Sequence, residues 1–116
     1  MKENIIKSKR FDFALRIVKL YQYLTEAKRE FVLSKQLLRS GTAISALVRE
    51  SEHAESKADF IHKLSIALKE ANESDYWLEL LFRSNYLYEK EFESLRNDLD
   101  EILRLLVSII KTSKGK

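Results

Sequence analysis

The chain of 116 residues contains no proline and only two glycines, Gly41 and Gly115. Proline is the strongest helix breaker and glycine the next, so almost nothing in this sequence interrupts a helix. Apolar residues recur every three or four positions, and no segment alternates apolar and polar residues between turn signals as a strand would. The sequence therefore predicts an all-α protein.

Polar breaks between the apolar stripes divide the chain into four helices. The predicted helices span about residues 5–24, 29–53, 57–83 and 89–111. Ser56 is a suitable N-cap for the third helix, with Asp59 in its first turn, whereas Tyr88 leaves the fourth helix without a side-chain cap. Short connections force consecutive helices to run antiparallel. We therefore expect one domain, 1–116, folded as an antiparallel up-down-up-down four-helix bundle.

The middle of the second predicted helix is unusually rich in small residues, which are Ser40, Gly41, Thr42, Ala43, Ser45 and Ala46. Glycine within a helix costs about 1 kcal/mol relative to alanine, so a compensating contact is expected. Small side chains let another helix approach closely, and Tyr76 and Trp77 are candidates to fill the space. The alternative is a break in the helix at Gly41.

The first predicted helix is apolar over more than one face. Its main stripe is Phe11, Ala14, Leu15, Val18 and Tyr21, flanked by Phe13, Ile17, Leu20 and Leu24. A helix that is apolar over so much of its circumference needs more than one neighbouring helix. We therefore expect apolar surface that a single bundle cannot bury, which would pack against other copies of the chain.

Charge is unevenly distributed along the chain, although the formal net charge is only +3. Residues 1–49 carry +7, residues 50–103 carry −8 and residues 104–116 carry +4. Oppositely charged helices could attract each other within or between copies, or a basic face could bind the phosphates of a nucleic acid. The candidate nucleic-acid-binding residues are Arg10, Arg16, Lys19, Lys28, Arg29, Lys35, Arg39 and Arg49.

Two carboxylate-x-x-His pairs, Glu50 with His53 and Asp59 with His62, flank the turn between the second and third helices. Such pairs hold metal ions in carboxylate-bridged bundles. Here they lie at the end of the bundle, and the first helix offers only Asp12 as an interior acid. We predict no metal, cofactor or catalytic residue, since no nucleophile, convergent histidine or glycine-rich phosphate loop is evident.

The chain has no cysteine, no apolar leader at its N-terminus and no apolar run of the ~18 residues that span a bilayer. A soluble cytoplasmic protein that binds no membrane is the expectation.

Long segments of the chain resemble one known family. They are FDFALRIVKLYQYL (11–24), EFVLSKQLLRSGTAI (30–44), KADFIHKLSIALKEANESDYWLELL (57–81) and YLYEKEFESL (86–95). The chain resembles the 23S ribosomal RNA intervening-sequence protein family of small bacterial four-helix bundles. The resemblance implies a ring-shaped homopentamer of no established biochemical role. The family is similar in fold to the accessory protein of diversity-generating retroelements, which binds nucleic acid and a reverse transcriptase.

The sequence departs from the family pattern after the RSGT segment. Ala43 stands where members usually have serine, and Leu47 where they have asparagine. What remains of the motif is interpreted as a structural polar cluster of Arg39, Ser40 and Glu50 facing Glu70 and Glu73. Two functional hypotheses follow from the residues and the resemblance together. The first is a non-enzymatic, self-assembling bundle that binds structured RNA, such as rRNA, through a basic face; the alternative is a protein-interaction scaffold or accessory partner of a nucleic-acid enzyme.

Overall fold

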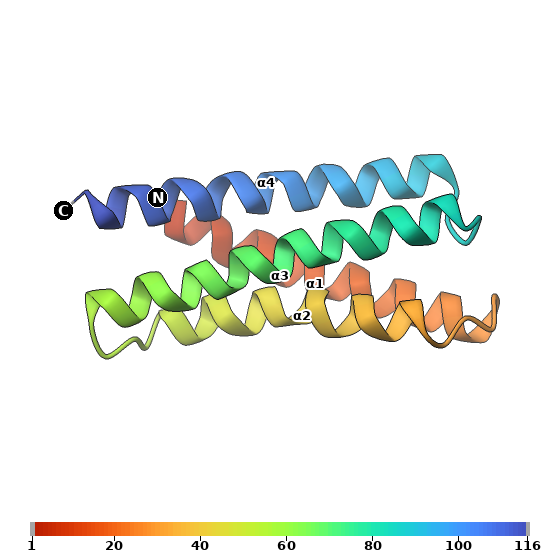
Figure 1. Ribbon diagram of the computed structural model, residues 1–116, viewed down its shortest axis with the longest axis horizontal. Coiled ribbons are helices and arrows are strands. Elements are labelled where there is room, and N and C mark those ends of the chain that lie inside the picture. The colour runs from red at the N-terminus through yellow and green to blue at the C-terminus, as the bar shows by residue number, and fades with distance from the viewer. Residues whose placement is uncertain (1, 116) are drawn as a thin grey trace.

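Four antiparallel helices make up the protein, which we describe over residues 2–115 from a computed structural model. The helices are α1 (Lys2–Glu26), α2 (Leu33–Ser51), α3 (Lys57–Arg83) and α4 (Glu89–Lys114). Each runs antiparallel to the one before it (Figure 1), and the bundle measures 47 × 22 × 20 Å. Residues 2–115 contain no strand, so the predicted all-α up-down-up-down bundle is confirmed.

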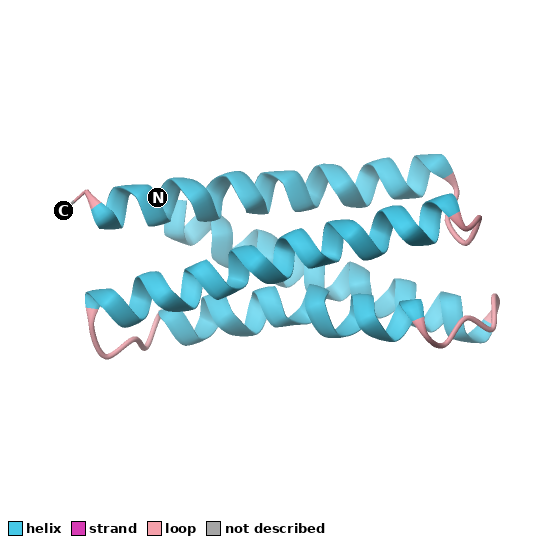
Figure 2. Cartoon of the chain, in the orientation of Figure 1, coloured by secondary structure: helices cyan, strands magenta, loops and turns pink. Residues whose placement is uncertain are grey.

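The helices form a square in which α1 neighbours α2 and α4, and α3 neighbours the same two helices. The α1–α2 and α3–α4 connections lie at one end of the bundle and the α2–α3 connection at the other (Figure 2). We call the first of these the two-loop end. It brings residues near position 28 of the sequence beside residues near position 88.

Local signals explain where α3 begins and ends. The Ser56 hydroxyl accepts a hydrogen bond from the Asp59 amide (3.0 Å), as predicted for an N-cap. At the other end, Asn85 adopts a left-handed conformation (φ 69°), and the amides of Asn85 and Tyr86 donate to the carbonyls of Phe82 and Leu81. This is a Schellman ending, which satisfies carbonyls that would otherwise lack a donor. Helix α4 begins after Tyr88 without a side-chain cap, as predicted.

Helix α2 begins at Leu33 rather than at the predicted residue 29, and ends at Ser51 rather than at 53. Arg29 is left-handed (φ 56°) and so cannot continue a helix. The Glu30 carboxylate then accepts hydrogen bonds from the amides of Val32 (3.1 Å), Leu33 (3.0 Å) and Ser34 (2.7 Å). Glu30 therefore caps α2 from outside the helix. Helices α1 and α4 are longer than predicted, since they begin at Lys2 and end at Lys114 respectively.

Two opposing effects act on the pKa of Glu30. Burial of the carboxyl raises the pKa, but the three backbone amides and the Ser34 hydroxyl outweigh burial, so the pKa lies below its ordinary value. Hydrogen bonds from amide donors favour the charged form of a carboxyl group. The cap is therefore strongest when Glu30 is ionised.

We expect Glu30→Gln to lower the free energy of unfolding at pH 7 by about 1–2 kcal/mol, the usual cost of a lost cap. Because folding lowers the pKa, this contribution is present above the unfolded pKa of about 4.3 and is lost as the pH falls through the folded pKa. Urea unfolding at pH 7 and at pH 3 measures it, with the exposed Glu55→Gln as control. A difference between Glu30→Gln and the unmodified protein that is as large at pH 3 as at pH 7 would contradict an ionic cap.

Apart from Ile6, the buried side chains of α1 are those predicted to flank its apolar stripe. Ile6, Phe13, Ile17, Leu20 and Leu24 are the buried side chains. Phe11, Leu15 and Val18, predicted as the main stripe, are exposed instead. The sequence shows that α1 has two apolar faces, and the packing of α2 and α4 decides which one is buried.

Helix α2 is continuous through Gly41, so the alternative of a break there is wrong. The predicted close approach occurs, but the helix that approaches is α1. A Cβ atom on Gly41 would lie 3.0 Å from Ile17 Cγ1 and 3.1 Å from Ile17 Cγ2. Tyr76 and Trp77 do not fill this space: Tyr76 is exposed and packs edge-on against Trp77, with ring centroids 4.9 Å apart.

Candidate nucleic-acid interface

Three arginines of the predicted basic face are engaged in contacts between helices. Arg10 on α1 donates to the carbonyl (3.2 Å) and the hydroxyl (2.8 Å) of Ser45 on α2, and its side chain is 12% exposed. Arg16 pairs with Asp98 of α4 at 2.6 Å. Arg39 of α2 forms ion pairs with Glu70, at 3.4 Å, and with Glu73 of α3. These arginines tie helices together, so little of their charge is available to a ligand.

The other predicted cations are exposed and lack an acidic partner among residues 2–115. Lys19, Lys28, Arg29 and Lys35 lie within two helical turns of the α1–α2 connection. We call these four residues the turn cluster. Arg49 is at the opposite end of α2, where it lines a hollow together with Glu50, His53 and Asp59. The predicted cations that remain without an acidic partner therefore lie mainly around the α1–α2 connection, at the two-loop end.

The structural polar cluster predicted around Arg39 is divided between two places. Arg39 faces Glu70 and Glu73 as expected, and Ser40 lies buried behind it. The Ser74 hydroxyl, which the sequence did not single out, donates to Ser40 Oγ at 2.9 Å. Glu50 does not join them, because it lies three turns further along α2 and pairs with Lys63 at 3.3 Å.

The two positions that depart from the family pattern lie on the same helix. Leu47 packs against the core from the edge of α2, and Ala43 is half-buried one turn before it. Leu47 therefore adds apolar packing at a position where a polar side chain would offer hydrogen bonds.

The carboxylate-x-x-His pairs do not converge into a metal site. Glu50 is paired with Lys63, and Asp59 Oδ2 accepts from the Glu55 amide at 3.1 Å. His53 and His62 are both exposed. Within residues 2–115, no group of three acidic, histidine or cysteine side chains is placed to hold a metal ion.

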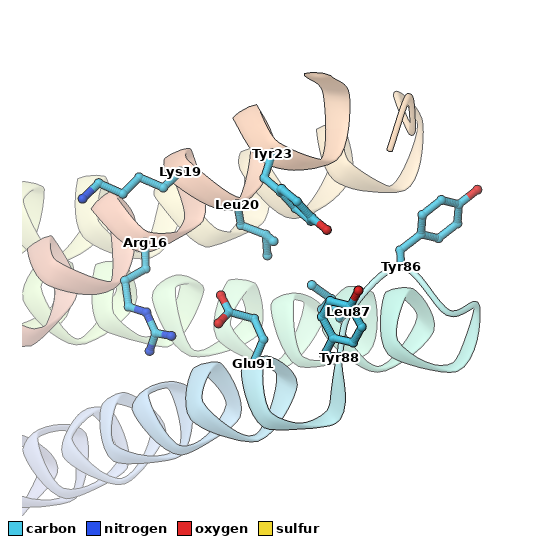
Figure 3. A pocket seen from close by; sticks show the side chains of 8 residues that line it. All are labelled: Arg16, Lys19, Leu20, Tyr23, Tyr86, Leu87, Tyr88 and Glu91. Atoms are coloured by element: carbon cyan, nitrogen blue, oxygen red, sulfur yellow. The ribbon is translucent and has the colours of Figure 1, made fainter. Parts of the chain in front are cut away.

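A pocket of about 400 Å³ opens at the two-loop end between α1 and the start of α4. Its wall is formed by Arg16, Lys19, Leu20, Tyr23, Tyr86, Leu87, Tyr88 and Glu91. Tyr23 and Leu20 extend from α1 toward Leu87 and Tyr88, and the Glu91 carboxylate extends from α4 toward α1 (Figure 3). Tyr86 points away from the others in the same view. The sequence did not predict that these residues lie together, because the pocket is formed by two segments more than 60 positions apart.

Lys28 connects this pocket to the turn cluster. Its ammonium lies over the ring of Tyr23, 6.0 Å from the centroid, and over the ring of Tyr88, 5.9 Å from the centroid. Tyr86 packs against the core, but Tyr88 is 75% exposed. Cations and exposed aromatic rings therefore occur together at this end of the bundle.

The outer face of α1 carries a line of exposed apolar side chains. Phe11, Leu15 and Val18, which are 56%, 47% and 37% exposed, follow one another at intervals of four and three residues. We call these three residues the outer α1 face. At 100° per residue they lie opposite the buried stripe that contains Phe13 and Ile17. Side chains placed this way cannot reach the core of their own bundle.

None of the helices within residues 2–115 combines the length and the hydropathy needed to cross a membrane.

Comparison with known proteins finds a matching family and similar solved structures. Residues 2–108 match the family described as 23S rRNA-intervening sequence protein. The chain is also similar to a protein with unknown function from the S23 ribosomal protein family of Bacteroides thetaiotaomicron VPI-5482, whose crystal structure was determined at 1.70 Å resolution. The two are 58% identical, with a TM-score of 0.95 over 96% of this chain and 99% of that chain. No curated protein matches the chain.

Proposed function

Because the chain belongs to the 23S rRNA-intervening sequence protein family, we propose that it is a non-enzymatic bundle that assembles with copies of itself and binds structured RNA. The resemblance to the family implies a ring of five copies, and we place this assembly in the cytoplasm. The matched crystal structure is described as that of a protein with unknown function.

The outer α1 face is the observation that carries the assembly half of the proposal. Single exposed apolar residues are common on protein surfaces, but three in line on one helix face are typical of a protein interface. The ion pair of Arg16 with Asp98 and the hydrogen bonds of Arg10 with Ser45 fix the rotation of α1 within the bundle. The outer face is therefore held toward solvent and available to a second copy.

A different protein could occupy the same face, as the accessory partner of a nucleic-acid enzyme would require. The two functions predict different oligomeric states for the purified protein in the absence of any partner. A self-assembling bundle is multimeric without any addition, whereas a bundle that needs a different partner stays a single chain until that partner is supplied.

The turn cluster supports the RNA half of the proposal. Its four cations are exposed, lie within two helical turns of one connection and have no acidic partner among residues 2–115, so they can approach phosphates without first breaking an ion pair. In a ring of copies the cluster would be repeated once per copy. Repetition raises the affinity for a long RNA without any new kind of contact.

We expect the affinity for a 23S rRNA fragment to fall steeply as salt rises, because phosphate binding releases counterions. Lys28→Glu combined with Lys35→Glu removes two phosphate contacts. This should reduce the slope of log K against log salt by about 1–2 and weaken binding at every salt concentration. Fluorescence anisotropy titrations at several salt concentrations measure both quantities.

The matched control is Lys69→Glu combined with Arg104→Glu, which makes the same change in net charge at exposed cations outside the turn cluster. If the two double variants weaken RNA binding equally, only net charge matters and the turn cluster is not an interface. Affinity that does not depend on salt would contradict phosphate binding altogether.

A further inference from the structure

We propose that the pocket at the two-loop end takes one unpaired guanine nucleotide of an RNA strand. This inference rests on the proposed RNA-binding function and adds a base-specific site to the salt-sensitive affinity of the turn cluster. Three kinds of side-chain group at the pocket could bind such a nucleotide. They are aromatic rings, a carboxylate without a partner within the described residues, and exposed cations.

The aromatic faces belong to Tyr23 and Tyr88. The Lys28 ammonium lies over both rings, 6.0 and 5.9 Å from their centroids, so each ring turns a face toward the same point. Lys28 is exposed and makes no ion pair within residues 2–115, which leaves its flexible side chain able to move aside. A planar base that enters there stacks on the tyrosine faces, which is the usual way that proteins hold unpaired bases.

The carboxylate of Glu91 selects the base. It extends into the pocket from the first turn of α4 and has no hydrogen bond or ion pair within the described residues. An ionised carboxylate offers two acceptor oxygens and no donor. The Watson–Crick edge of guanine presents two adjacent donors, N1–H and N2–H, which match both oxygens. Adenine, cytosine and uracil each place an acceptor next to their donor on that edge, and this acceptor repels the carboxylate.

The positive side chains around the pocket favour an anionic ligand over a cationic one. Two tyrosines and a carboxylate would also suit an alkylammonium ion. Here Lys19 lines the pocket and Lys28 covers its rings, so a cationic ligand would meet two positive side chains that lack an acidic partner within residues 2–115. A nucleotide instead gains from them, because its phosphates can bind Lys19 and Lys28 while the base reaches Glu91.

The test uses fluorescent uridine oligonucleotides with one central guanosine, inosine or adenosine, titrated with the full-length protein at low salt. We expect guanosine to bind about tenfold or more tightly than adenosine, because a pair of hydrogen bonds to a charged group is lost. Inosine keeps N1–H but lacks the N2 amino group, and it should fall between the two. Glu91→Gln should abolish the preference, and Glu93→Gln, the same change two residues away outside the pocket, should retain it.

Tyr88→Ala should weaken binding of all three oligonucleotides by about fivefold or more through lost stacking. Tyr76→Ala, an exposed tyrosine on α3, is its control. Tyr88 is mostly exposed and caps α4 without its side chain, so this variant is expected to fold normally. Equal affinity for the three bases, or equal behaviour of Glu91→Gln and Glu93→Gln, overturns the guanine site while salt-sensitive RNA binding stands. Absence of binding to any RNA overturns both this inference and the RNA function.

Discussion

Replacing Gly41 with leucine is expected to lower the free energy of unfolding by about 3 kcal/mol, near the upper end of the usual cost of overpacking. Even a Cβ atom at this position would lie 3.0 and 3.1 Å from two carbon atoms of Ile17. Ile17 is 1% exposed and belongs to the core, so it cannot turn out into solvent. The larger side chain must therefore push α1 and α2 apart.

Ala46→Leu is the matched control, since it adds a similar side chain to an exposed position of the same helix. It should change the stability by no more than about 0.5 kcal/mol. Urea unfolding at one fixed protein concentration measures both variants, because the stability of an assembling protein depends on its concentration. If Gly41→Leu is as stable as Ala46→Leu, the close approach of α1 to α2 is wrong.

A second substitution tests whether Gly41 and Ile17 are in direct contact. Ile17→Ala removes the atoms that Gly41 faces, so the double variant Ile17→Ala with Gly41→Leu should be more stable than the sum of the two single effects predicts. Neighbouring residues commonly show coupling of about 0.5–3 kcal/mol in such a cycle. Simple additivity would mean that the leucine disturbs something other than Ile17.

Leu15→Glu is expected to dissociate the assembly while leaving the bundle folded. Leu15 lies in the middle of the outer α1 face and is 47% exposed in a single chain, so the fold of that chain does not need it. Between two copies the new carboxylate would be buried in an apolar interface without a partner, which costs several kcal/mol. The molar mass should fall toward the 13.7 kDa of one chain, and circular dichroism should still report a helical protein.

Val107→Glu is the control for this change. Val107 is a comparably exposed apolar residue, at 44%, but it lies on α4 rather than on the outer α1 face. The variant introduces the same charge and should remain assembled. Dissociation by Val107→Glu together with an intact Leu15→Glu assembly would place the interface on α4 instead.

Helix caps formed between residues a few positions apart could be predicted from the sequence. Ser56 and Asp59 are three positions apart, and their hydrogen bond depends on little else. The cap provided by Glu30 was not predicted, because it depends on a left-handed residue at Arg29 that bends the chain back over the start of α2. The sequence contains no glycine or asparagine there to announce such a bend.

Features that depend on how each helix is rotated could not be predicted. Both apolar faces of α1 have helical periodicity, so the sequence alone does not tell whether Phe11 or Phe13 enters the core. For the same reason, Gly41 was correctly predicted to allow a close approach, but Ile17 rather than Tyr76 or Trp77 makes it. Helix α2 has neighbours on two sides, and the small residues do not show which of the two comes closer.

The candidate site was only partly visible in the sequence. Charge counts identified the cations of the turn cluster, but they could not separate them from arginines such as Arg16, whose acidic partner Asp98 lies on another helix. The pocket at the two-loop end was missed because Tyr23 and Tyr88 come together only when the bundle closes. Long-range proximity of this kind has no periodic signal in one sequence.

The molar mass of the unmodified protein, measured by light scattering over a dilution series, decides whether the outer α1 face joins copies of this chain. We predict a constant mass of about five times the 13.7 kDa of one chain down to micromolar concentration. A mass of 13.7 kDa throughout the series would show that one bundle is complete by itself, with Phe11, Leu15 and Val18 left in contact with water.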